Sequence, residues 1–290
     1  MCSVTFIPRA DGFLLGMNRD ESRSRPVAVA PRIHHRAGHD SLHPSEPTGG
    51  TWIGVNDSGL CCALLNWYSN ANDPTRSRTS RGGIIPALMA TGTITEVRPV
   101  LATQRLRSMA PFRLVVVSSS ERSLHEFRWN QKTLAGLHYP WKRHHWFSSG
   151  FDEHGAQRQR SRTAQKAAGA PDAGTLPWLR RLHASHDPVI GPFSICMHRP
   201  DAATVSYTEV VATSQYATMR YHDGPLCCAP TPKTTHELSL QTKCKESARN
   251  PTNLPAGYSY ENQQPPFQSS RRSLLPRGVS SCRESDAIAR

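Results

Sequence analysis

The chain opens with alternating apolar and polar residues, a pattern that predicts a β-hairpin. In residues 2–8 small or polar positions alternate with apolar ones, and residues 13–17 form an apolar run. Asp11-Gly12 between them is a strong signal for a two-residue turn. Because such a turn fixes the pairing register, partner numbers should sum to about 23. This register places Cys2 opposite Glu21, at the end of the polar run that follows the second strand.

The same patterns recur along the chain and predict further strands and four helices. The other expected strands are residues 51–56, 60–67, 112–118, 124–129, 146–149, 193–199, 205–212 and 216–222. Apolar residues at helical spacing predict helices over residues 83–91, 95–109, 152–168 and 176–185. Residues 26–47, rich in proline and histidine, are expected to form a long surface loop.

The order of these elements favours an α+β fold. Strands, helices, strands, helices and strands follow one another without the regular alternation of a parallel sheet, so two antiparallel sheets faced by helices are expected. We assign this domain to residues 1–228. Residues 229–290 are dominated by Pro, Ser, Thr, Gln and Arg and lose apolar periodicity, which predicts a disordered basic tail.

Charge and targeting signals narrow the classes of protein to consider. The formal net charge of +13 would suit a polyanionic partner, but the arginines are scattered and no nucleic-acid motif accompanies them. We therefore expect a solvated basic surface and no nucleic-acid partner. Pro8, Arg9, Asp11 and Asn18 interrupt any signal-peptide core, and no apolar run has the length of a membrane span. A cytoplasmic location is predicted, and the oligomeric state stays open.

The cysteine spacing predicts no metal site and no cofactor. The eight cysteines are Cys2, Cys61, Cys62, Cys196, Cys227, Cys228, Cys244 and Cys282. They contain no CxxC pair, which fits neither a disulfide framework nor a zinc ribbon. Four histidines in the proline-rich stretch are candidates for a metal or haem site, but surface histidines are the simpler interpretation. They are His34, His35, His39 and His43.

Candidate chemistry centres on Cys2. Cysteine has a small side chain, so removal of Met1 is expected to leave Cys2 with a free α-amine beside its thiol. The amine, with a pKa of about 7.7 to 8, accepts the proton of a thiol whose pKa is about 8.5. A nearby Arg19 guanidinium would lower the thiol pKa further, and Asp20 would hold the ammonium. The alternative is a passive cysteine followed by a solvated turn.

Several segments resemble the NRDE family, also called the transport and Golgi organisation protein 2 family. The resemblance runs from Met1 to about Cys228. It is carried by MCSVTF at the start, MNRDESRSRP, GGTWIGVNDSGLCCALLN, SRG at 80–82, FSSGFD at 147–152 and HDPVIGPFSICMHRPDAATVSYTEV. The family is similar to the N-terminal nucleophile hydrolases, which implies a four-layer αββα sandwich. Relatives among these hydrolases cleave amides with an N-terminal cysteine, an arginine and an aspartate.

The resemblance implies roles for individual residues. Cys2 would be the nucleophile with its own amine as base, Arg19 and Asp20 would tune and hold them, and Asn66 would donate to the oxyanion. The residues expected to line the binding site are Asn18, Glu21, Trp52 and Arg81, although core packing explains Trp52 at least as well. The sequence departs from the amidases at Ser148 and Ser149, where those enzymes carry an asparagine.

Three functions therefore remain open. The first is hydrolysis of a linear amide, ester or thioester through an acyl-Cys2 intermediate. The second is a non-catalytic carrier or trafficking protein that holds haem or an acyl lipid in the same cleft. The third is a protein that acts through partner contacts on its basic surface and tail. The expected ligand is accordingly a small-molecule amide, an acyl group or a haem-like molecule.

Overall fold

Two antiparallel sheets form the centre of the protein. A computed structural model describes residues 2–70, 75 and 78–241 of the 290-residue chain. The first sheet has the order β10 (His144–Ser148), β1 (Cys2–Arg9), β2 (Gly12–Ser22), β11 (Ala202–Ala212), β12 (Tyr216–His222) and β13 (Thr234–Ser239). The second has the order β3 (Val29–Arg36), β4 (His39–Ser45), β5 (Ile53–Asn56), β6 (Leu60–Asn66), β7 (Phe112–Ser118), β8 (Ser123–Trp129) and β9 (Leu134–Tyr139).

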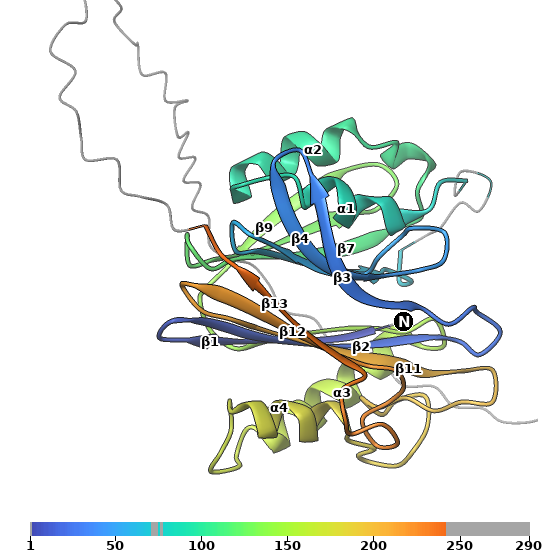
Figure 1. Ribbon diagram of the computed structural model, residues 1–290. Helices are drawn as coiled ribbons and strands as arrows, with labels where there is room; N and C mark the ends of the chain where they lie inside the picture. The colour runs from blue at the N-terminus through green and yellow to red at the C-terminus, as the bar shows by residue number, and fades with distance from the viewer. Residues whose placement is uncertain (1, 71–74, 76–77, 242–290) are drawn as a thin grey trace, which may run out of the picture. The chain divides into compact units, whose positions relative to one another are not determined.

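Helices cover the outer face of each sheet. The helical elements are η1 (Arg81–Gly83), α1 (Ile84–Leu88), η2 (Ile94–Glu96), α2 (Val97–Thr103), η3 (Leu106–Ser108), α3 (Glu153–Ala167) and α4 (Leu176–His183). Figure 1 shows α1 and α2 against the second sheet and α3 and α4 against the first. The predicted α+β fold, an αββα sandwich, is confirmed.

Three apolar clusters hold the four layers together. The largest fills the space between the sheets and includes Phe6 and Met17 from one sheet and Leu42 and Val115 from the other. A second cluster packs α1 and α2 onto the second sheet, and a third packs α3 and α4 onto the first. Burial of two sheet faces against each other is the principal hydrophobic contribution to this fold.

The first hairpin is confirmed, but its register differs from the prediction. Cys2 lies opposite Arg19 rather than Glu21, because Ala10 and Asp11 form the turn and partner numbers sum to 21. Gly12 follows at φ +104°, and a Cβ there would lie 2.0 Å from the Ala212 carbonyl oxygen. Only glycine fits that conformation and that approach. Because the register differs by two residues, the face on which each side chain lies is unchanged.

The prediction of a long surface loop over residues 26–47 is wrong, because most of this segment forms the hairpin of β3 and β4. Proline obscured the strands in the sequence. Pro31 lies at a register shift in β3, an edge strand, where a missing backbone N–H removes no essential ladder bond. His34 and His43 are adjacent across this hairpin, with their rings stacked at 3.9 Å.

Other predicted elements need smaller corrections. Residues 193–199 are irregular apart from an isolated bridge between His198 and Ala203, and β9, an exposed edge strand, was not predicted. The helices expected over residues 83–91 and 95–109 are shorter and interrupted. The remaining hairpins and α3 and α4 are confirmed within a few residues.

The first sheet continues beyond the domain boundary expected at Cys228. β13 pairs with β12 from Tyr216↔Ser239 to Tyr221↔Thr234, and Leu238 is buried in the core between the sheets. The compact unit runs from Met1 to Cys244. Residues 242–290, the larger part of the predicted disordered tail, lie outside the described residues.

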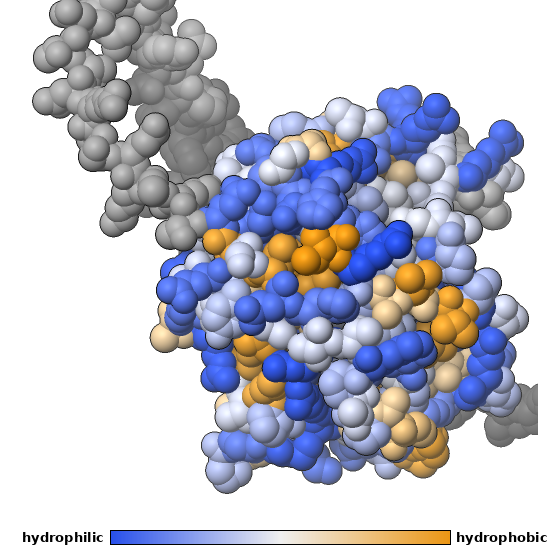
Figure 2. All heavy atoms as spheres, viewed as in Figure 1, coloured by the Kyte–Doolittle hydropathy of each residue, from blue (hydrophilic) through white to orange (hydrophobic). Residues whose placement is uncertain are grey.

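Polar and charged side chains cover most of the face seen in Figure 2, with small apolar patches between them. Within the described residues, every helix is too short or too polar to cross a bilayer.

Candidate functional site

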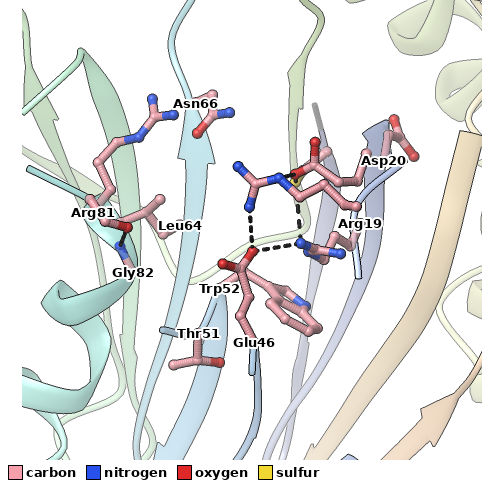
Figure 3. Close-up of a pocket in the computed structure, with 13 residues that line it drawn as sticks. Arg19, Asp20, Glu46, Thr51, Trp52, Leu64, Asn66, Arg81 and Gly82 are labelled. Carbon is pink, nitrogen blue, oxygen red and sulfur yellow. Dashed lines mark hydrogen bonds and ion pairs between the residues drawn. The ribbon is translucent and has the colours of Figure 1, made fainter. Parts of the chain in front are cut away.

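A pocket opens where the start of β1 meets the second sheet. It has about 100 Å³ of space for water-sized molecules, and polar groups dominate its lining. Figure 3 shows the side chains that converge on it. The lining residues are Cys2, Arg19, Asp20, Glu21, Arg25, Glu46, Thr51, Trp52, Leu64, Asn66, Ser80, Arg81 and Gly82. Seven of the eight sequence-predicted site residues are therefore brought together here.

Cys2 lies at the base of this pocket with 6% of its surface exposed. Its backbone nitrogen donates a hydrogen bond of 3.0 Å to Ser148 Oγ on the neighbouring strand β10. Burial raises the pKa of the thiol, against the lowering effects of the positive amino terminus and Arg19. The expectation that Arg19 favours the thiolate is right in direction, but the cost of desolvation is larger.

Arg19 is held in place from three sides. Its guanidinium donates to Glu46 Oε1 at 2.7 Å, lies 3.6 Å from Glu21 Oε2 and stacks 4.4 Å above the ring of Trp52. Arg25 Nη1 also lies 2.8 Å from Glu46 Oε1. Positive and negative side chains therefore alternate along this wall of the pocket. Glu46 was missed in the sequence because it lies within the proline-rich stretch of residues 26–47, which was expected to be a surface loop, and has no motif of its own.

Asp20 faces the opposite side of β2 from Arg19, since neighbouring residues in a strand alternate. Thr204 Oγ1 donates to Asp20 Oδ1 at 2.7 Å, and Arg160 Nη2 lies 3.4 Å from Asp20 Oδ2. Burial raises the pKa of the Asp20 carboxyl, and Arg160 and the positive amino terminus oppose that rise. Asp20 is thus anchored beneath the start of β1.

Arg160 is a candidate site residue that sequence reasoning missed. It lies on α3, is fully buried and also donates to Ser3 Oγ at 3.1 Å. Helical spacing in the sequence could have identified it, because Ala156, Arg160 and Thr163 share the buried face of α3. An arginine on an apolar helix face requires a buried partner.

Asn66 and Arg81 line the opposite wall, on the side of the second sheet (Figure 3). Asn66 Nδ2 donates to Tyr68 Oη at 2.8 Å and retains a second N–H. Arg81 donates to the Pro111 carbonyl at 2.9 Å, and burial lowers its pKa. This wall offers donors and positive charge to a bound molecule.

Two glycines allow this wall to form. Thr51 N donates to the Gly82 carbonyl at 3.0 Å, which brings the two backbones together. A Cβ on Gly82 would lie 2.8 Å from the Gly50 Cα, closer than real side chains allow. The GGT and SRG segments quoted above therefore meet in space, and glycine is required where they cross.

Asn18 is the predicted binding residue that does not line the pocket. Its amide donates to the carbonyls of His183 and Ile195, each at 2.9 Å, and pairs with His183 Nδ1 at 3.1 Å. It connects β2 to α4 and to the irregular segment before β11. The histidines of β3 and β4 are likewise absent from the pocket lining.

A comparison with sequence families gives the family of this chain. The model of the family described as Transport and Golgi organisation 2 matches residues 1–164, more than half of the sequence. The chain belongs to this family. The resemblance inferred from its motifs is confirmed, and the residues matched by the family model include Cys2, Arg19, Asp20, Asn66 and Arg81.

Comparisons with curated sequences and solved structures add the following. No curated protein sequence matches the chain significantly. Penicillin V acylase from Agrobacterium tumefaciens is similar at 13% identity and a TM-score of 0.46, over 82% of this chain and 86% of that one. Two variants of a conjugated bile acid hydrolase from Clostridium perfringens have 11% identity and TM-scores of 0.45 and 0.44, over 82% of this chain and 92% of theirs.

Proposed function

We propose that this protein is a cysteine hydrolase of the N-terminal nucleophile type, which cleaves a linear amide, ester or thioester through an acyl-Cys2 intermediate. One observation carries the proposal. The Cys2 thiol opens onto a polar pocket while the nitrogen of the same residue lies 3.0 Å from Ser148 Oγ. Nucleophile and prospective base therefore belong to one residue at the base of one pocket.

Removal of Met1 converts the Cys2 amide nitrogen into an amine, which is the first step of this mechanism. The Ser148 hydroxyl can accept one N–H of that amine, as it accepts the amide N–H now, and leave the lone pair free for the thiol proton. Proton transfer gives a thiolate and an ammonium in contact. Arg19 and the hydrogen bond from the Asp20 backbone favour the thiolate, and the Asp20 carboxylate favours the ammonium.

The covalent steps follow from this ion pair. The thiolate attacks the carbonyl carbon, and the free N–H of Asn66 stabilises the oxyanion, an effect worth about 3 kcal/mol per donor. The C–N bond of an amide, the C–O bond of an ester or the C–S bond of a thioester then breaks, and the ammonium gives its proton to the leaving group. The amine next removes a proton from water, which attacks the thioester carbon and releases the acid and the Cys2 thiol.

The charges of the pocket support an acidic group on the substrate. Arg81 is half-buried, donates to a backbone carbonyl, and makes none of the ion pairs found within residues 2–70, 75 and 78–241. A carboxylate beside the scissile bond would pair with this guanidinium in bidentate geometry. The limited volume fits a small head group near Cys2, with any longer portion of the ligand outside the pocket.

A non-catalytic carrier is the second candidate. The protonation chemistry of Cys2 favours it while Met1 is still attached. When the Cys2 nitrogen is an amide it has no lone pair to accept a proton, and burial raises the thiol pKa. In that state the pocket can bind an acyl lipid or haem-like ligand without reacting with it. The state of the N-terminus therefore separates the two functions.

The test compares two proteins, one that begins at Cys2 and one with an uncleavable extension before Cys2. The probe is a thioester reagent that transfers its acyl group to reactive thiols, and intact mass reports the acyl-enzyme. We expect acylation of the first protein and its loss in the extended protein and in Cys2→Ala. Cys61→Ala is the matched control, because that thiol is buried and does not line the pocket, so this variant should leave labelling unchanged.

Each outcome separates the candidates. Undiminished acylation of the extended protein would contradict the amine-base mechanism. Absence of acylation in the protein that begins at Cys2, together with retention of a bound ligand in both proteins, would support the carrier.

A further inference from the structure

A second cluster of reactive side chains lies on the other side of the first sheet, among the segments that follow α4 and β12. It consists of His186, Cys196, His198 and Cys227. One potential ligand atom from each residue lies within 4.8 Å of all the others. The proposed hydrolase chemistry uses none of these four side chains.

The distances in this cluster match those of a tetrahedral metal site. Cys196 Sγ lies 3.5 Å from Cys227 Sγ, and His198 Nε2 lies 3.5 Å from the first sulfur and 3.4 Å from the second. With Zn–S near 2.3 Å and Zn–N near 2.0 Å, the edges of a Cys₂His₂ tetrahedron are about 3.3 to 3.8 Å. The three ligand atoms thus already lie close to one face of such a tetrahedron.

His186 supplies an independent indication of a ligand. Its Nε2 atom is buried and has no hydrogen-bond partner among the described residues, which is costly for an imidazole nitrogen. The His186 ring lies 5.0 Å from the His198 ring at 73°. A metal ion bound by both rings, through Nε2 in the case of His186, would satisfy that nitrogen.

We propose that His186, Cys196, His198 and Cys227 bind one Zn²⁺ ion as a closed, four-coordinate structural site. Two thiolates and two imidazoles are a donor set that zinc prefers, and four protein ligands leave no open position for substrate. Binding replaces the two thiol protons by two metal–sulfur bonds and releases those protons to solvent. The oxidation state of every group is unchanged.

The backbone around the cluster is already fixed. Cys196 N donates to the Ser185 carbonyl at 3.0 Å, and Met197 N donates to Thr204 Oγ1 at 2.9 Å. These bonds hold an irregular segment in place without a strand or helix of its own. The metal would join that segment to the end of α4 and to the loop after β12.

The cluster is also connected to the candidate active site. Thr204 Oγ1, which receives the Met197 N–H, donates its own hydrogen to Asp20 Oδ1 at 2.7 Å. Bound zinc would therefore stabilise the segment that positions Thr204, and through it the carboxylate beneath Cys2. Zinc binding at this cluster requires no hydrolase activity at Cys2, and the metal content of the protein measures it directly.

The test measures zinc in purified protein after reduction, incubation with Zn²⁺ and removal of free metal. We expect about one zinc per chain, and its loss in Cys227→Ser and His198→Ala. Cys228→Ser is the matched control. The Cys228 thiol lies 3.5 Å from Cys227 Sγ but is not part of the four-residue group, so this variant should keep its zinc.

Wild-type protein supplies a readout that does not depend on the folding of variants. Replacement of Zn²⁺ by Co²⁺ should give the thiolate charge-transfer and intense visible bands of a four-coordinate sulfur-ligated ion. Chelation should lower the thermal midpoint, and added Zn²⁺ should restore it. A chain without stoichiometric zinc, zinc that Cys227→Ser retains, or a Cys196–Cys227 disulfide in the intact mass would each overturn the proposal.

Discussion

Asp20 and Arg160 illustrate how strongly a few residues determine the site. Both side chains are fully buried, and their charged groups lie 3.4 Å apart. Burial alone raises the pKa of Asp20, and the guanidinium opposes this rise. A buried ion pair of this kind adds little to the free energy of unfolding compared with apolar residues of the same shape. Loss of one partner, however, is strongly destabilising, because it leaves an uncompensated buried charge.

Replacement of Arg160 by methionine should therefore lower the free energy of unfolding by about 3 to 5 kcal/mol. It should also displace Asp20 and so weaken reactions at Cys2. The measurement is urea denaturation of wild type and variant, with Arg162→Ala, an exposed arginine of the same region, as the control. A loss below about 1 kcal/mol would mean that Asp20 is neutral in the folded protein and needs no cation.

At the scale of elements, β13 decides where the ordered domain ends. It extends the first sheet beyond β12, and Leu238 fills part of the core between the sheets. Further backbone bonds, from Leu240 N to the Gln215 carbonyl and from Gln241 N to the Asp57 carbonyl, are each 2.7 Å. The last of these joins the end of the described chain to the second sheet.

A chain that ends at Cys228 should consequently be less stable than one that ends at Cys244. Loss of Leu238 alone removes a buried leucine, a change that costs about 2 to 5 kcal/mol when it is truncated to alanine. Thermal unfolding of the two truncated chains and of the full chain measures this. We expect the chain ending at Cys244 to keep the midpoint of the full chain, and equal midpoints for both truncations would show that β13 adds no stability.

Across the whole molecule, buried titratable groups connect the layers and make stability depend on pH. His183 of α4 lies 3.0 Å from Thr5 Oγ1 of β1, and burial lowers its pKa to about 3. Burial likewise lowers the pKa of His145 to about 4. In the second sheet, burial tends to raise the pKa of Glu126, but bonds from Arg128, Arg113 and Tyr139 outweigh this and hold it at about 2.

The sign of the pH dependence follows from these shifts. A buried neutral histidine binds its proton less readily than in the unfolded chain, so stability should fall as pH decreases from about 6.5 to 4 and below. Glu126 is held ionised, so its contribution is present above about pH 4.5 and is lost as pH falls toward 2. Full protonation of each of these groups lowers the free energy of unfolding by on the order of 3 kcal/mol.

Urea denaturation at a series of pH values measures this dependence. His183→Gln should flatten the curve between pH 6.5 and 4, while His154→Gln, which changes an exposed histidine, should leave it unaltered. Glu126→Gln should remove the loss of stability below pH 4.5. If stability is constant from pH 7 to 3, these groups titrate alike in the folded and unfolded chain.

Local pattern alone determined much of this protein. Alternation and turn residues predicted the hairpins β1 to β2, β5 to β6 and β7 to β8, because neighbouring strands joined by short turns depend on residues close in sequence. The motif around residues 18–21 and the Met-Cys start predicted the family, and with it Cys2, Arg19, Asp20, Asn66 and Arg81 as pocket residues.

Tertiary structure decided what depends on residues far apart in the chain. The strands β3, β4 and β13 form because other strands accept them, despite a proline in each of β3 and β4 and weak apolar alternation in β13. Glu46 and Arg160 enter the site through contacts across 27 residues or more, from Arg19 to Glu46 and from Ser3 to Arg160. The cluster of His186, Cys196, His198 and Cys227 has no motif spacing, because folding of two loops onto one sheet, rather than a short turn, brings its ligands together.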